Sequence, residues 1–519
     1  MSITENSVLI RFLTAFWAAL TGAWANSGLA RRADDLEHAL RKGAENSGLC
    51  QFVWREGAMI RLWPHSASCR LFTALANLPC ALVKWIYKLG RPVWDGSLAF
   101  RLITALGGAA PLLIGLFLLV MLVVPHAMWN NLYGLLGAVA LTAVFVLGSA
   151  VRSKYRLELD RLGPYMLLYM GMICYGLISS LSIHMSVRYF LFHVTCFLLV
   201  LLLVSSVRSY AQLQQTAVLA VLGITVAAVY GCYQGYVGVE IIPSQQDMIL
   251  NAGMPGRVYS FFDNPNNFAE LLVMLIPLDL ALLLNARGWR GKLLALVSMA
   301  ICVAAIGYTY GRSCWLGLVL AVLVFFALQN WRFIPLLILL GLCAVPLLPQ
   351  TIYNRILTIG NTNDSSTQYR FAIFDATGKL LKDFWYRGVG LDPDLVHRVF
   401  EQYPVMSNGA YPIHTHNNYL QMWCETGLFG LIAYLAVLCF QLKAGVKSYF
   451  SSADQRVKTL LAASLGSFCG ILLVSIAEYT WFYPRNMFLF WVIFGIIGVC
   501  VKLGQMPPEM QSGRRRLKG

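Results

Sequence analysis

Long runs of apolar residues, separated by short polar loops, dominate the chain from residue 101 to residue 503. A run of about 20 apolar residues is long enough to cross a lipid bilayer as a helix. The runs are continuous and do not alternate between polar and apolar positions, which excludes the strands of a membrane β-barrel. The pattern predicts an all-α, polytopic integral membrane protein with about twelve transmembrane helices. The expected spans are residues 103–124, 128–149, 163–182, 189–206, 215–238, 266–286, 292–310, 313–329, 333–349, 427–442, 459–478 and 486–503.

The first hundred residues follow a different pattern. Two moderately apolar stretches, residues 8–24 and 71–89, contain charged or polar interruptions and many Trp and Tyr residues, and a highly charged segment separates them. Such stretches are typical of amphipathic helices that lie in the membrane interface. We therefore expect residues 1–100 to be a cytoplasmic or interfacial extension and residues 101–503 to be the transmembrane domain. Residues 504–519 are expected to form a basic cytoplasmic tail.

Charge and composition indicate which side of the membrane each loop faces. Only 12% of the 519 residues are charged and the mean hydropathy is +0.63, whereas soluble proteins carry about 25% charged residues. The net charge of +16 comes largely from loops such as RSKYRLELDR, NARGWRGK and KAGVKSYFSSADQRVK, while the alternate loops contain few basic residues. The positive-inside rule then places both termini in the cytoplasm. The excess charge indicates membrane topology and not a nucleic-acid partner.

Cysteines and targeting signals add little. Most of the cysteines lie inside apolar runs, where they act as small apolar side chains. No CxxC pair occurs, so the sequence supports neither a zinc site nor a disulfide framework. No cleavable signal is evident at the N-terminus.

Two loops on the outer side are long, residues 239–265 and above all residues 350–426. A loop as long as the second is usually functional, and it has enough residues to form helices of its own. At its downstream end stands the stretch HTHNNYLQMWCETGLFG, residues 414–430, where two histidines, two asparagines and a glutamate precede the next apolar run. The polar cluster is therefore expected at the outer membrane interface.

His416 is the first candidate for chemistry. A helix is expected to begin near the asparagines and to end at Gly427, so that His416, Leu420, Trp423 and Gly427 share one face. An imidazole is partly neutral at physiological pH and can accept a proton from a sugar hydroxyl as a general base. The structural alternative is an interfacial histidine that caps a helix or anchors the chain at the lipid headgroups.

Arg312 and Arg257 are candidates for binding an anion. Arg312 stands between two apolar runs, where an arginine is costly unless it faces a cavity or a partner. Its planar guanidinium suits phosphate oxygens; the alternative is that it snorkels to headgroups. Arg257 precedes Asn264-Pro265-Asn266, a turn in which asparagine is a good N-cap. A helix N-terminus beside an arginine suits phosphate, although an ordinary turn before a span fits equally well.

Two more arginines, a zinc site and a nucleotide site are also considered. Arg370 is expected on an amphipathic helix of the long loop, where a solvated or salt-bridged role is the simpler alternative. Arg485, at the outer end of the last span, fits an aromatic belt. His414 and His416 with Glu425 could bind zinc, but the HExxH arrangement is absent. The lack of a GxxxxGK[ST] loop also disfavours nucleotide use.

These stretches together resemble the O-antigen ligase and polymerase superfamily of bacterial membrane glycosyltransferases. That family has an arginine followed four positions later by leucine, as in Arg312-Ser-Cys-Trp-Leu316. It also has His-Asn, nine residues and Gly-x-x-Gly, as in His416-Asn417 and Gly427-Leu-Phe-Gly430. The stretches FFDNPNNFAELL and YRFAIFDATGKLLKDFWYRGVGLDPD look like two more family segments. The resemblance extends over about residues 100–503.

The resemblance implies a GT-C-type helical bundle in the bacterial cytoplasmic (inner) membrane. Its donor would be a glycan on undecaprenyl diphosphate, and its acceptor a glycan or a lipid-linked molecule at the outer face. His416 would deprotonate or orient the acceptor hydroxyl, and Arg312 and Arg257, assisted by Arg370, would hold the diphosphate. The family is thought to need neither a metal nor a nucleotide cofactor. Supporting roles would fall to Asn417, Asn264, Asn266, Gly427 and Gly430.

Several alternatives remain open at this point. A ligase joins a finished glycan to lipid A core or another acceptor, whereas a polymerase of the same superfamily joins repeat units, and one sequence does not separate the two. Protein O-oligosaccharyltransferases usually extend beyond the last span, so this option ranks last. A solute transporter would usually carry its charged groups near the bilayer midplane, and here they are expected at the outer rim. A structural scaffold would leave both motif spacings unexplained.

Overall fold

The computed structural model describes residues 26–242, 253–362, 364–404 and 412–506, together with a few single residues between 15 and 23. Throughout these residues the regular structure is helical, which confirms the all-α class. Most of the predicted interfacial stretch 8–24 and nearly all of the basic tail lie outside the described residues. The chain divides into two compact units, Met1–Arg61 and Leu62–Gly519. In the first unit, the charged segment predicted between the two apolar stretches forms a helix, α2 (Gly28–Asn46). The other helices among the described residues of this unit are α3 (Gly48–Trp54) and α4 (Ala58–Leu62), whose last residue lies past the boundary.

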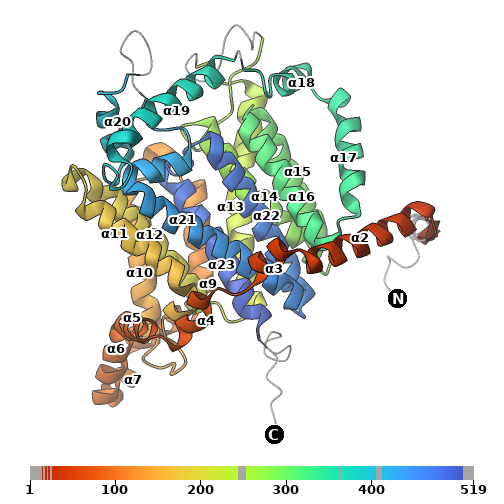
Figure 1. The fold of residues 1–519 in the computed structure, drawn as a ribbon. Coiled ribbons are helices and arrows are strands. Elements are labelled where there is room, and N and C mark those ends of the chain that lie inside the picture. The colour runs from red at the N-terminus through yellow and green to blue at the C-terminus, as the bar shows by residue number, and fades with distance from the viewer. Residues whose placement is uncertain are drawn as a thin grey trace. The chain divides into compact units, whose positions relative to one another are not determined.

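The second unit is a helical bundle with additional helices at each end (Figure 1). Long apolar segments form helices because only a helix satisfies every backbone hydrogen bond within the segment itself. The helices of the bundle are α9 (Ala110–Val123), α10 (Leu132–Gly148), α11 (Gly163–Ile178), α12 (Ile183–Ser206), α13 (Tyr210–Val237), α14 (Pro265–Asn285), α15 (Trp289–Tyr308), α16 (Arg312–Asn330), α17 (Phe333–Ala344), α21 (Asn418–Ser451), α22 (Gln455–Ala477) and α23 (Pro484–Gly504).

A strict test of helix length and composition gives fewer membrane spans than the twelve predicted. In the described part of the chain nine helices meet it, or ten if α8 (Leu98–Gly108) and α9, bent by 75°, form one span. Every one of the twelve predicted spans coincides with a helix, but α10, α11 and α17 are short, with 17, 16 and 12 residues. The structure therefore confirms a polytopic membrane protein, and the count of twelve stays a prediction.

In its described residues the long segment 350–426 forms helices of its own at one end of the bundle, as predicted (Figure 1). They are α18 (Gln350–Leu357), α19 (Ser365–Phe384) and α20 (Pro393–Phe400). Helices α19 and α20 share a small apolar core with the first turns of α21, built from residues such as Leu380, Val396, Phe400 and Cys424. This core fixes the segment 365–400 to the bundle.

At the centre of the bundle α14, α22 and α23 are mostly buried, while α15 and α16 expose much of their surface. Helices α16 and α22 pack closely at small residues. A Cβ atom on Gly317 would lie 2.5 Å from Val474, and one on Gly470 would lie 2.5 Å from the Gly317 carbonyl. Small residues at such crossings allow membrane helices to approach each other. The contact holds the start of α16 beside the end of α22, at the same end of the bundle as α19.

At the opposite end lie four helices upstream of the first bundle helix (Figure 1): α5 (Ala67–Ala76), α6 (Leu78–Leu89), α7 (Arg91–Gly96) and α8. Ala67–Leu89, formed by α5 and α6, is one of the nine helices that meet the test of length and composition. Its polar contacts, however, are with the loop 153–162 between α10 and α11. The interfacial position of the second apolar stretch therefore stays a prediction.

Candidate active site

The turn between α15 and α16 brings three arginines together. Arg257 Nε donates a hydrogen bond to the Thr309 carbonyl (2.8 Å), and Arg355 Nε donates to the Tyr310 carbonyl (3.3 Å). Carbonyl groups at the C-terminal end of a helix carry partial negative charge and attract cations. Arg312 follows as the first residue of α16. The sequence YTYGRS thus collects arginines from three separate parts of the chain.

Arg312 is largely buried, with 12% of its side chain exposed. Its Nη1 donates to the Thr358 carbonyl (2.9 Å), and its Nη2 donates to Asp364 Oδ1 and to Ser366 Oγ (both 2.9 Å). Burial acts to raise the pKa of Asp364, but hydrogen bonds from Ser366 and Arg312 outweigh burial and hold it below the usual range. Both nitrogens at the end of the guanidinium fork therefore join the start of α16 to the link between α18 and α19.

The segment Asn264-Pro265-Asn266 begins α14, as predicted. The Asn264 side chain accepts a hydrogen bond from the Asn266 backbone N–H (2.8 Å) and so caps the helix. The Asn266 side chain points toward the site, where its Oδ1 accepts from Arg257 Nη2 and its Nδ2 donates to Glu478 Oε1 (3.3 Å). Asn266 is therefore a bridge between an arginine and a carboxylate.

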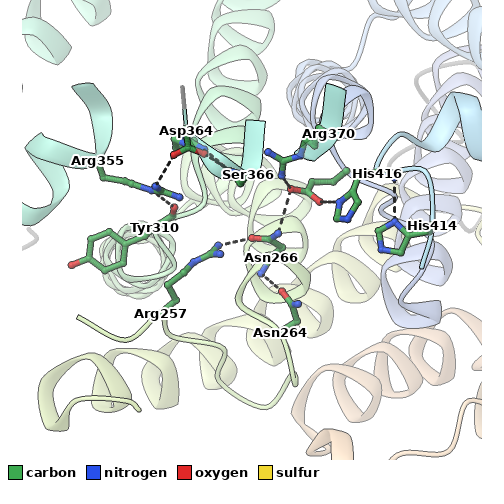
Figure 2. Close-up of polar contacts among 12 residues, drawn as sticks. Arg257, Asn264, Asn266, Tyr310, Arg355, Asp364, Ser366, Arg370, His414 and His416 are labelled. Atoms are coloured by element: carbon green, nitrogen blue, oxygen red, sulfur yellow. Dashed lines mark hydrogen bonds and ion pairs between the residues drawn. The ribbon is translucent and has the colours of Figure 1, made fainter. Parts of the chain in front are cut away.

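Glu478, directly after α22, is the centre of the site. Its Oε1 accepts from Arg370 Nη2 and from Asn266, while its Oε2 lies 3.4 Å from His416 Nδ1. Burial acts to raise the pKa of Glu478, but the charge of Arg370 and the hydrogen bond with His416 outweigh burial and hold it at about 2. The carboxylate is thus ionised at neutral pH. In Figure 2 the side chains of Asn266, Arg370 and His416 point toward one another.

His416 lies just before α21 and not within it. Asn417 is the N-cap of that helix, and His416 has φ of 48°, in the left-handed region. The expectation that His416 shares a helix face with Leu420 and Trp423 is therefore wrong. Because a capping residue has extended geometry, the helical periodicity does not reach back to position 416.

The ring of His416 has one nitrogen engaged by the protein. Nδ1 faces Glu478, whereas among the described residues Nε2 has no hydrogen-bond partner, and 29% of the side chain is exposed. The ionised carboxylate favours the tautomer with a proton on Nδ1. The lone pair of the neutral ring then lies on Nε2, so the exposed nitrogen can accept a proton from a bound molecule.

Two neighbours hold His416 in its unusual backbone conformation. Its N–H donates to His414 Nδ1 (3.2 Å), and burial lowers the pKa of His414 to about 3, so His414 stays neutral and can accept. Asn417 Nδ2 donates to the carbonyl of Ile476 (2.8 Å), two residues before Glu478. The motif His-Asn therefore places the imidazole and ties the start of α21 to the segment that carries the carboxylate.

The glycines of the Gly-x-x-Gly motif shape the same helix. At Gly427 the helix is broken, with φ of 71° and ψ of −179°, and a Cβ atom there would lie 2.1 Å from the Tyr386 carbonyl oxygen. The break, predicted at this residue, lets Leu428 N–H bond to the Trp385 carbonyl (2.8 Å). At Gly430 a Cβ atom would meet Thr426 Oγ1 at 2.0 Å. The motif thus fastens the chain after α19 to α21.

The site carries more positive than negative charge. Four guanidinium groups surround two carboxylates, which leaves an excess of two positive charges; the arginines are Arg257, Arg312, Arg355 and Arg370, and the carboxylates are Asp364 and Glu478. Burial, with the charge of neighbouring arginines, lowers the pKa of Arg257 and of Arg355 to about 10, so both stay protonated at neutral pH. This excess suits a ligand with about two negative charges.

Sequence reasoning missed three members of the site: Glu478, Asp364 and Arg355. Glu478 had a usable signal, because a glutamate at the end of an apolar run is rare without a partner. Asp364 and Arg355 stand in an ordinary polar stretch of the loop and had none. His414 was considered only as a metal ligand. Among the described residues, no group of three or more His, Cys, Asp and Glu side chains is arranged to hold a metal ion.

Arg485 has a different environment from the four arginines of the site. It is fully buried at the start of α23, where its Nη1 donates to the carbonyl groups of Met121 (3.0 Å) and Val124 (2.6 Å). Its guanidinium carbon lies 4.7 Å from the centre of the Trp129 ring. These contacts join α9 to α23, so the low weight given to Arg485 agrees with a packing role.

Fold and site together define a class: an integral membrane protein whose helical bundle holds a buried, cationic site beneath the helices of one long segment. Residues 280–435 match the protein family described as O-antigen ligase. This finding confirms the resemblance to the O-antigen ligase and polymerase superfamily, and it supports a function of that general type. No curated protein matches the chain. The matched residues contain Arg312, Arg370 and His416 but neither the Asn264 segment nor Glu478.

Proposed function

We propose that the protein is a membrane glycosyltransferase of the O-antigen ligase type. It transfers a glycan from undecaprenyl diphosphate to a hydroxyl group of an acceptor at the outer face of the bacterial cytoplasmic membrane. A repeat-unit polymerase, which would use the same donor chemistry with a second lipid-linked glycan as acceptor, is the runner-up. The observation that supports this function most is the contact of His416 and Arg370 with one ionised carboxylate, Glu478.

In this mechanism His416 is the general base. Its Nε2 takes the proton of the acceptor hydroxyl as the oxygen forms a bond to the anomeric carbon of the donor sugar. Glu478 orients the ring through Nδ1 and stabilises the imidazolium that results, as a carboxylate does in other His-carboxylate pairs. General-base catalysis of this kind contributes about 10²–10⁴-fold to a rate.

The arginines act on the leaving group. The bond between the anomeric carbon and the phosphate oxygen breaks, and undecaprenyl diphosphate departs with an additional negative charge on its terminal phosphate. Arg257, Arg312 and Arg370 hold the diphosphate and compensate this charge. Opposite unit charges 4 Å apart attract by about 4 kcal/mol at an effective dielectric constant of 20. Positively charged groups fixed before the reaction are therefore able to lower the barrier.

The arrangement of spans follows from the same proposal. With twelve spans and both termini in the cytoplasm, the segment 350–426 stands on the outer side, where flipped lipid-linked glycans are presented. The helical bundle would then be of the GT-C type. Its large extracytoplasmic segment would cover the site and carry one of the diphosphate ligands, Arg370.

A reconstitution experiment tests the function. Purified protein is incubated with an undecaprenyl-diphosphate-linked glycan and, separately, with lipid A core or with a second lipid-linked glycan. Products on lipid A core identify a ligase, and longer lipid-linked chains identify a polymerase. A protein that moves the glycan across a vesicle membrane without forming any glycosidic bond would instead be a transporter.

A further inference from the structure

A second site lies at the end of the bundle opposite the candidate active site, beneath the segment formed by α5 and α6. This segment is held to the loop 153–162 at separate points. Asn77 Nδ2 donates to the Leu157 carbonyl (2.9 Å) and its Oδ1 accepts from Leu157 N–H (2.8 Å), while Lys84 Nζ donates to the carbonyl groups of Tyr155 (2.9 Å) and Ser153 (3.2 Å).

Between the α5–α6 segment and the loop is a cavity of about 540 Å³. Its volume falls within the range of small-molecule sites, about 300–1,000 Å³. The polar side chains that line it are Arg70, Thr73, Asn77, Lys84, Arg156 and Asp160. Three of them are basic and one is acidic, so the cavity suits a ligand that carries negative charge together with a smaller positive group.

Two buried polar atoms of residues that line the cavity, Thr73 Oγ1 and Asp160 Oδ1, have no hydrogen-bond partner among the described residues. The other carboxylate oxygen of Asp160, Oδ2, accepts from Arg156 Nη2 (2.9 Å), and 32% of the Asp160 side chain is exposed. The carboxylate of Asp160 therefore offers a ligand in the cavity a hydrogen-bond acceptor.

The basic side chains of the cavity offer donors in turn. Lys84 uses two of its three N–H groups for carbonyls of the loop. The side chain of Arg70, which is exposed, has no hydrogen bond to the described residues. Lysine and arginine donors that converge on one space suit a phosphate group. The cavity thus combines donors for a phosphate with a separate acceptor for an ammonium.

The outer surface of the α5–α6 segment is strongly apolar. Leu71, Leu78, Leu82, Trp85 and Leu89 are each more than half exposed, between 55% and 68%. A contiguous apolar face of this kind, with basic residues and Trp beside it, is typical of helices that lie in the headgroup region of a bilayer. A ligand of the cavity would therefore have acyl chains as its immediate surroundings.

We propose that this cavity binds the headgroup of a phospholipid that carries a phosphodiester and a primary ammonium, of the phosphatidylethanolamine type. Arg70 and Lys84 donate hydrogen bonds to the phosphodiester, and the ammonium donates to the carboxylate of Asp160. The acyl chains extend along the apolar face of the α5–α6 segment. The lipid comes from the leaflet at this end of the bundle, and the proposal does not depend on the reaction at the other end.

Native mass spectrometry of the full-length protein in detergent tests the proposal. The probe is an equimolar mixture of phosphatidylethanolamine and phosphatidylglycerol, which share the phosphodiester and differ in the ammonium. We expect the protein to retain phosphatidylethanolamine about tenfold more than phosphatidylglycerol. Equal retention of the two lipids by the unaltered protein would overturn the proposal before any variant is made.

Three variants locate the binding. Arg70→Gln combined with Lys84→Gln should lower the retention of both lipids about tenfold. Asp160→Asn should abolish the preference for phosphatidylethanolamine. The exposed Lys88 is on α6 outside the cavity lining, so Lys88→Gln is the matched control and should bind as the unaltered protein does.

A competition experiment distinguishes binding of a whole lipid from binding of a free headgroup. Glycerophosphoethanolamine has the same phosphodiester and ammonium but no acyl chains. It should not displace the bound lipid at equal concentration, because the apolar face contributes to binding. Displacement by this molecule, or an unchanged preference in Asp160→Asn, would contradict the assignment.

Discussion

At the scale of single residues, the proposed reaction depends on the imidazole of His416 and the carboxylate of Glu478. His416→Ala should leave the protein folded and abolish glycan transfer, with a loss of about 10²–10⁴-fold expected for a general base. Transfer is measured with purified protein and a lipid-linked donor. Lys379→Gln, which alters an exposed ion pair on α19, is a control that should transfer normally. Normal glycan attachment by the His416 variant would refute the catalytic role.

Glu478→Gln keeps the shape of the side chain and removes its charge. We expect a loss of about ten- to a hundredfold in turnover, because a hydrogen bond to a charged group contributes about 1.5–3 kcal/mol. The acceptor KM should change little, since the residue orients His416 and does not contact the acceptor. A ten- to hundredfold rise in the acceptor KM with unchanged turnover would show that Glu478 acts in acceptor binding instead.

The same carboxylate predicts how stability depends on pH. The pKa of Glu478 is lowered in the folded protein, from the ordinary value of 4.5 to about 2. Its charge therefore stabilises the fold above about pH 4.5, and this stabilisation is lost as the pH falls toward 2. The thermal unfolding temperature should fall over that range in the unaltered protein and less steeply in Glu478→Gln. Asp375→Asn, on the exposed side of α19, should follow the unaltered protein.

Arg312→Lys tests the planar fork. Arginine at this position binds Thr358, Asp364 and Ser366 at once, and a lysine ammonium cannot reproduce the two-nitrogen geometry. We expect reduced transfer together with easier proteolysis between α18 and α19. Arg290→Lys, in an exposed position on α15 at the other end of the bundle, should have no effect. Wild-type turnover in Arg312→Lys would contradict the proposed clamp on the diphosphate.

Individual residues were predictable where a motif fixed them and unpredictable where only the fold joins them. The positions of His416, Arg312 and Asn264 followed from spacing and capping rules. The partnership of His416 with Glu478 did not, because 62 residues separate them in the chain and helix packing alone brings them together. For the same reason the sequence did not show that Asp364 is the ion-pair partner of Arg312.

At the scale of elements, the break in α21 is the feature that positions the long segment over the site. Gly427→Ala should destabilise the protein by about 2–4 kcal/mol, from the left-handed backbone and the clash with the Tyr386 carbonyl. Transfer should fall with it, since α19 carries Arg370. The measurements are thermal unfolding and transfer at a temperature at which the variant is folded.

Gly378→Ala is the matched control for this change. Gly378 lies within α19, and a Cβ atom there would contact nothing within 4 Å. The variant should be neutral, or more stable by up to about 1 kcal/mol, because alanine favours a helix over glycine. If Gly427→Ala behaved in the same way, the break would have no structural role.

Elements were predicted better than their exact limits. Apolar runs of about 20 residues gave the positions of the helices, and the turn at Asn264 and the break at Gly427 were placed correctly. The bend between α8 and α9 was not foreseen, because both sides of it are equally apolar. The start of α21 near the asparagines was predicted correctly. His416 was wrongly placed on a face of that helix, since the periodic pattern of a helix does not reveal where its cap lies.

At the scale of the whole molecule, loop charges predict the orientation in the membrane. An epitope tag inserted at residues 360–362 should be accessible from outside intact cells, and one at residues 450–452 should become accessible only after the membrane is opened. Both positions contain exposed residues, so the tags should be tolerated. The reverse result would place the site on the cytoplasmic side and exclude an outer-leaflet reaction.

Glycan transfer by purified protein tests whether His416 is the general base of the reaction. The unaltered protein, His416→Ala and Lys379→Gln are each incubated with an undecaprenyl-diphosphate-linked glycan and an acceptor, and released undecaprenyl diphosphate is measured together with the glycan product. We expect the unaltered protein and Lys379→Gln to form the same amount of undecaprenyl diphosphate and the same amount of glycan product. We expect His416→Ala to form neither. Formation of product by His416→Ala at the normal rate would contradict the role of His416 as general base.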